Sequence, residues 1–281
     1  MYLRRIAHSG RSNLIIATLV LCLAFLTALN SSLFLAYVGE YVGLSGGDGN
    51  FGESLEPDIV IPSAQEIMIQ SVYGINDNGR KQIVDIVGFA LPYLILVLQA
   101  GLLLTLLTED GSRYMYIIRY ESYSKWLLRN LSKISFGLIS LWTLFYMAVF
   151  IFSFLLADHT GGLGGIFYHL NIYASPNVSF VEVVVFQYAI GCLTCFLIAS
   201  SQFMISIILK DAAKAYVYLS MFILLCAFLG MFRIYNPLMM SKHGEINNLI
   251  GVSPLMTLGL LLGVSLGGIL INKRYLRRKG L

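Results

Sequence analysis

Six long apolar stretches are the feature of this sequence that most constrains its fold. A helix of about 20 mostly apolar residues crosses roughly 30 Å of hydrocarbon. The stretches lie at residues 13–37, 84–107, 134–157, 180–209, 215–235 and 253–271. None alternates polar and apolar residues, so a membrane β-barrel is a poor fit. We therefore predict an all-α polytopic membrane protein, with residues 1–281 forming one domain of six transmembrane helices.

The composition points to the same environment. Charged residues make up 12% of the chain and hydrophobic residues 57%, whereas a soluble domain carries roughly 25% charged residues. So few charges cannot cover a water-facing surface. The net charge of +4, without a basic soluble domain, argues against nucleic-acid binding. Four cysteines are too few for a disulfide framework.

Basic residues indicate the orientation, because cytoplasmic loops carry an excess of Lys and Arg. With the N-terminus in the cytoplasm, all but four of the 19 basic residues fall on the cytoplasmic side. The exceptions are Arg80, Lys81, Arg233 and Lys242. This sorting predicts that both termini are cytoplasmic, that residues 38–83 form an outer loop, and that residues 108–133 form a cytoplasmic loop.

The outer loop contains the signature of a short helix. Pro62 stands at its start, Ser63 is placed as the N-cap, and Glu66 follows three residues later, which is the spacing of a capping box. Its apolar residues Ile67, Ile69 and Val72 are expected to rest on the membrane surface or on the tops of the spans. Two interpretations stay open, a solvated cap over the bundle and a lid above a translocation path.

The cytoplasmic loop is rich in basic and aromatic residues. In a helix, Ile118, Ser122 and Trp126 share one face, while Arg119, Lys125 and Arg129 can meet lipid phosphates. The loop is either a positively charged anchor with no further role or an interfacial helix with a partner-facing side. A tight turn is expected at residues 210–214, suited to a smaller second contact.

The remaining motifs indicate packing rather than chemistry. Gly259, Gly263 and Gly267 repeat every four residues, which lets another helix approach closely. The histidines show no metal-ligand spacing, so we expect no metal site and no catalytic residues. The spans carry no charge at mid-depth, and the chain lacks a Walker motif. Energy for any transport is therefore expected from another chain, and we do not expect an enzyme.

The loop EDGSRYMYIIRYESYSKWLLRNLSK, together with the six-span topology, resembles the ABC-2 type membrane (permease) subunits of ABC transporters. In style the chain is most similar to Gram-positive subunits of antimicrobial-peptide export or bacteriocin immunity. The resemblance implies a multi-pass protein of a bacterial cell membrane that exports an amphipathic peptide or a lipid-like substrate. It also implies a separate ATPase subunit, which holds ATP and Mg, and a second permease subunit, identical or related. This chain itself would hold no cofactor.

By the same resemblance, the loop after the second span would be the main coupling segment to the ATPase. The residues placed in that role are Glu109, Gly111, Arg113, Tyr116, Arg119, Lys125, Trp126, Lys210 and Lys214. The alternative is a non-transporting membrane immunity or sensor protein that binds a peptide through its outer loop.

Overall fold

The computed structural model describes residues 2–45, 62–72, 83–108, 123–157, 180–209 and 211–230, with three single residues at 267, 270 and 274. The helices are α1 (Tyr2–Ser45), α2 (Ala64–Val72), α3 (Ile83–Thr108), α5 (Tyr123–Leu156), α7 (Phe180–Leu209) and α8 (Ala212–Gly230). Every element in this part of the chain is helical, so the all-α class is confirmed.

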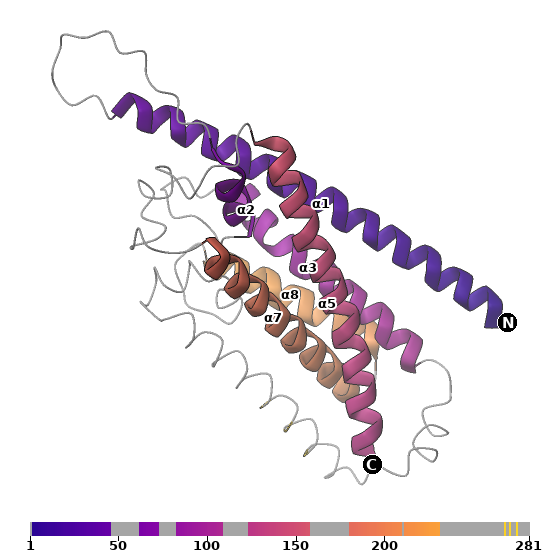
Figure 1. Cartoon of the computed structure of the whole chain (residues 1–281). Coiled ribbons are helices and arrows are strands. Elements are labelled where there is room, and N and C mark those ends of the chain that lie inside the picture. The colour runs from indigo at the N-terminus through magenta and orange to yellow at the C-terminus, as the bar shows by residue number, and fades with distance from the viewer. Residues whose placement is uncertain are drawn as a thin grey trace, which may run out of the picture.

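The five long helices form a bundle in which direction alternates along the chain (Figure 1). Gln99, near the end of α3, contacts Asn13 of α1, and Trp126 at the start of α5 contacts Phe203 near the end of α7. Tyr216 near the start of α8 lies beside Gly101 of α3. The beginnings of α5 and α8 therefore lie at one end of the bundle, together with the ends of α3 and α7.

We call this the basic end, because exposed Lys125, Arg129 and Lys133 of α5 and Lys214 of α8 lie there. The helix α2 lies near the opposite end (Figure 1).

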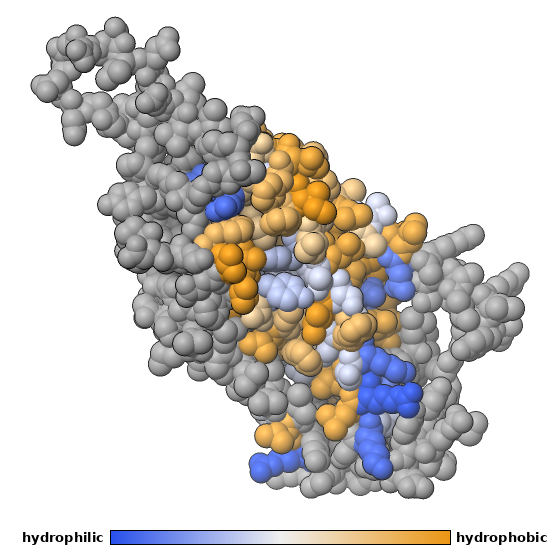
Figure 2. Space-filling view, in the orientation of Figure 1, coloured by the Kyte–Doolittle hydropathy of each residue, from blue (hydrophilic) through white to orange (hydrophobic). Residues whose placement is uncertain are grey.

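Among the described residues, three helical segments are long and apolar enough to cross a membrane, namely Asn13–Tyr37, Leu128–Leu156 and Gln187–Ser206. Two shorter apolar segments, Ala90–Thr105 and Ala212–Leu225, run beside them. Large apolar side chains cover the outside of the bundle, and Figure 2 shows this apolar surface above hydrophilic residues at the lower end. An exposed apolar surface of this extent suits lipid rather than water, which supports membrane association.

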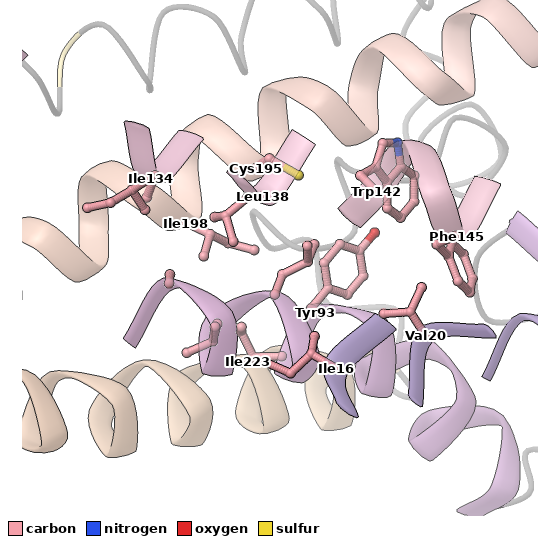
Figure 3. Packing of buried hydrophobic residues seen from close by; sticks show 14 of the residues in the cluster. Ile16, Val20, Tyr93, Ile134, Leu138, Trp142, Phe145, Cys195, Ile198 and Ile223 are labelled. Atoms are coloured by element: carbon pink, nitrogen blue, oxygen red, sulfur yellow. The ribbon is translucent and has the colours of Figure 1, made fainter. Parts of the chain in front are cut away.

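Side chains from all five long helices meet in one core. Figure 3 shows Ile16 of α1, Tyr93 of α3, Trp142 of α5, Cys195 of α7 and Ile223 of α8 in this cluster, and all five are buried. Helices that associate in lipid depend on close packing, because burial from lipid gives them little hydrophobic gain. Shape complementarity in this core is therefore the main source of stability.

Three glycines allow the helices of this core to approach closely. A Cβ at Gly191 of α7 would collide with the indole of Trp142. One at Gly137 of α5 would lie 2.8 Å from Cδ1 of Leu103, and one at Gly101 would lie 3.1 Å from Nε2 of Gln202. No repeat or motif in the sequence predicts the packing role of these three glycines.

The capping box predicted at Ser63 and Glu66 is confirmed. The backbone N–H of Ser63 donates to Oε2 of Glu66 over 2.9 Å, and the N–H of Glu66 donates to Oγ of Ser63 over 3.2 Å. α2 begins at Ala64, as this cap requires. Its apolar residues rest on the span tops: Ile67 packs with Ala28 and Leu35 of α1.

Several predicted boundaries shift. α7 coincides with residues 180–209, but α1 continues to Ser45, beyond the predicted end of the span at residue 37. α5 begins at Tyr123, inside the predicted loop 108–133. The physical reason is that hydropathy marks the lipid-covered part of a helix, whereas backbone hydrogen bonding continues past it. Almost all of residues 253–271 lie outside the described part of the chain.

Candidate functional site

The first turns of α5 form the best-defined part of the predicted coupling segment. The helix runs without interruption from Tyr123 to Leu156, so its basic start and its apolar span are one rigid element. Lys125 is exposed, whereas Trp126 beside it is buried with 3% of its surface accessible. The two residues thus point one basic group outward and one aromatic ring inward at the same level of the bundle.

Trp126 lies inside the bundle, where its ring is tilted against that of Phe203 in α7 with ring centroids 5.7 Å apart. The coupling role predicted for Trp126 stays a prediction. The contact with Phe203 makes the indole a link between the start of α5 and the end of α7. Sequence periodicity could not reveal this link, because it depends on which helix is the neighbour.

The turn between α7 and α8 lies at the same end of the bundle. α7 ends at Leu209 and α8 begins at Ala212, so the connection is shorter than the predicted turn at residues 210–214, and Lys214 lies in the first turn of α8. Asp211 caps α8 by accepting hydrogen bonds from the N–H groups of Ala213 (2.9 Å) and Lys214 (3.2 Å). These bonds, with that to Lys214 the largest contribution, lower the pKa of the Asp211 carboxyl below its ordinary value. The ammonium of Lys214 lies 3.7 Å from Oδ2 of Asp211, with both side chains exposed.

The other predicted coupling and packing residues are mostly outside the described part of the chain. They are Glu109, Gly111, Arg113, Tyr116, Arg119, Lys210, Gly259 and Gly263. Gly267 is described and helical. The structure records no heavy atom within 4 Å of the place its Cβ would take, counting described residues only.

Uncharged polar groups lie between the helices at two levels. Towards the basic end, the amide of Gln99 donates to Asn13 over 3.4 Å, and Gln202 is fully buried beside Gly101. In the other half of the bundle, Thr143 and Tyr188 share a hydrogen bond of 2.8 Å.

Tyr146 is in that same half and donates to the carbonyl of Val184 over 3.0 Å. Residues 13–37, 86–108, 134–157 and 183–209 contain no charged residue. The interior at both levels is therefore polar but uncharged.

Within the described part of the chain, no group of three or more His, Cys, Asp or Glu residues is placed to hold a metal ion. The chain matches no protein-family model, and comparisons with curated proteins and with solved structures gave no match. The fold and the surface together define the class, an all-helical, membrane-associated protein.

Proposed function

We propose that this chain is the permease subunit of an ATP-driven transporter of the ABC-2 type, with six spans and both termini in the cytoplasm of a bacterial cell. A separate ATPase subunit binds beneath the basic end and hydrolyses ATP with Mg. Two permease subunits, identical or related, enclose a path through which an amphipathic peptide or a lipid-like substrate is exported.

The continuity of α5 is the observation that carries this proposal. A force applied by a docked ATPase to the segment around Arg119 and Lys125 would pass directly into the membrane-embedded part of α5, because Tyr123–Leu156 is one helix. Trp126 would pass part of that motion to α7 through Phe203. Two helices of the bundle would then move together, as rigid-body rocking of a transporter half requires.

The uncharged interior of the bundle supports a transport mechanism whose energy comes from another chain. A carrier driven by protons or sodium ions usually places an ionisable residue or a broken helix at mid-depth. The middle parts of the described spans contain Gln, Ser, Thr and Tyr but no charged residue. Polar groups scattered through an apolar interior suit an amphipathic cargo better than a bare ion.

The rival function is a non-transporting immunity or sensor protein whose outer loop binds a peptide. The position of α2 weakens this rival, because Ile67, Met68 and Ile69 are already buried in the bundle. These apolar side chains are not available to hold an external peptide unless α2 leaves its place.

A paired charge-reversal experiment tests the proposal. The chain is expressed with the ATPase that co-purifies with it in mild detergent, and ATP hydrolysis and export are measured in proteoliposomes. Arg119→Glu with Lys125→Glu is expected to abolish export while membrane insertion persists. The matched control is Arg80→Glu with Lys81→Glu in the predicted outer loop, which is expected to leave coupling intact. Normal export by the first variant, or the absence of any co-purifying ATPase, would contradict the proposal.

A further inference from the structure

Three basic side chains form a stripe along the first turns of α5. Lys125, Arg129 and Lys133 follow one another at intervals of four residues, and all three are exposed. Residues four apart lie on the same face of a helix. Because α5 contains no acidic residue, the stripe gives this end of the helix a net positive charge.

The length of the apolar segment sets the depth of this stripe. Leu128–Leu156 has 29 residues, and at 1.5 Å per residue it extends about 43 Å. The hydrocarbon core is about 30 Å thick, so roughly 13 Å of the segment lies within the headgroup layers. Arg129 and Lys133 stand in the first turns of the segment, where lipid phosphates are found.

An exposed aromatic residue continues the stripe towards the hydrocarbon. Phe136 is seven residues after Arg129, which places it on the same face two turns deeper. It is 73% exposed, so no described part of the chain covers it. One helix face therefore presents positive charge at phosphate depth and an apolar ring directly below it, which matches the two parts of a phospholipid.

We propose that Arg129 and Lys133 bind the phosphate of an anionic phospholipid in the leaflet at the basic end, with Phe136 against its acyl chain. A guanidinium can hold a phosphate through two parallel hydrogen bonds. The long side chain of Lys133 can extend its ammonium towards the headgroups while its methylene groups stay in apolar surroundings. A soluble protein is a poorer fit, because the face continues into hydrocarbon at Phe136. The site requires no ATPase, so it stands independently of the proposed function.

Lipid binding to the purified full-length chain tests this site. Fluorescently labelled phosphatidylglycerol and phosphatidylcholine are titrated in detergent against the wild type and against Arg129→Gln with Lys133→Gln. Each basic residue near an anionic surface contributes about a fivefold gain in affinity. The double variant is therefore expected to bind phosphatidylglycerol about 30-fold more weakly, with phosphatidylcholine binding unchanged.

Two control variants separate this site from general charge effects. Lys214→Gln removes a positive charge at the same end, next to Asp211, and is expected to leave phosphatidylglycerol binding unchanged. Arg129→Lys with Lys133→Arg preserves the charge and is expected to retain most of the affinity. An unchanged affinity in the glutamine variant, or an equal loss in Lys214→Gln, would overturn the assignment.

Two measurements on the wild type remain decisive even if the glutamine variant does not fold. Added salt is expected to weaken binding of phosphatidylglycerol and not of phosphatidylcholine, because salt screens exposed charges. Inorganic phosphate at the same concentration as the lipid is expected not to displace it. Salt-independent binding, or displacement by phosphate alone, would refute a lipid site.

Discussion

The indole of Trp126 packs against the ring of Phe203, and this contact joins the start of α5 to the end of α7. Trp126 directly follows Lys125, which is exposed at the basic end. The surface expected to receive a partner is thus backed directly by an aromatic contact between two helices. We therefore expect motion at the start of α5 to disturb α7.

Removal of the Trp126 ring is therefore expected to destabilise the bundle. Trp126→Ala leaves a cavity beside Phe203, and large-to-small substitutions of this kind cost about 3–5 kcal/mol. Unfolding in detergent by SDS titration measures the loss. The exposed neighbour provides the comparison: Lys125→Ala should change the free energy of unfolding by less than about 0.5 kcal/mol. Similar values for the two variants would show that the indole is not part of the core.

The contact between Gly191 and Trp142 predicts a steric effect that a second substitution relieves. The methyl group of Gly191→Ala would overlap the indole of Trp142, and such overpacking costs about 1–3 kcal/mol. In the double variant with Trp142→Phe, the smaller ring should recover part of this loss, as a double-mutant cycle would measure.

Gly101→Ala serves as the matched control, because the nearest atom to the new methyl group is the end of the flexible Gln202 side chain at 3.1 Å, and Cβ of Tyr216 lies at an ordinary contact distance of 3.6 Å. It should cost less than Gly191→Ala. An equal cost at both glycines would mean that the packing of α5 on α7 is looser than described.

The capping box predicts a local effect on α2. Ser63→Ala removes the hydroxyl that accepts the N–H of Glu66, and the loss of such a cap costs about 1 kcal/mol. Hydrogen exchange of residues 64–72 should become faster, with little change elsewhere. Ser71→Ala in the same helix removes only a hydroxyl bonded to the carbonyl of Ile67, so exchange should stay near wild type. Faster exchange in Ser71→Ala alone would contradict this account of the cap.

Asp211 predicts a pH effect at the start of α8. Its pKa is lowered in the folded protein, so ionised Asp211 stabilises the turn at neutral pH. This stabilisation is complete above the ordinary Asp pKa of 3.8 and is lost as the pH falls through the lower pKa that Asp211 has in the folded protein. Asp211→Asn retains a capping oxygen without titrating. The thermal stability of the wild type should fall more steeply than that of the variant between pH 4 and pH 2, by roughly the small amount typical of exposed ion pairs. Parallel pH profiles would show that ionised Asp211 does not stabilise this turn.

Several elements of this fold follow from local sequence signals. The run of apolar residues from Phe180 predicts α7 within its observed bounds, and the spacing of Ser63 and Glu66 predicts the start of α2. Both signals act within one turn or one helix, where neighbours in sequence are neighbours in space.

The contacts between helices could not be predicted in the same way. The basic and aromatic sequence around Trp126 is typical of an interfacial anchor. Only the contact with Phe203 shows that Trp126 is a core residue. Gly137 and Gly191 carry no repeat that marks them, and their importance comes from Leu103 and Trp142 on other helices. Hydropathy identifies which helices enter lipid, but it does not identify which helices pack together.

The sidedness of Lys125 tests the central claim most directly, because a cytoplasmic motor can act only on a cytoplasmic surface. The four cysteines, Cys22, Cys192, Cys195 and Cys226, are first replaced by alanine or serine, and single variants Lys125→Cys and Lys81→Cys are made. A membrane-impermeant maleimide applied to intact cells should label Lys81→Cys and leave Lys125→Cys unlabelled until the cells are permeabilised. Labelling of Lys125→Cys in intact cells would place the basic end outside the cell and contradict the account.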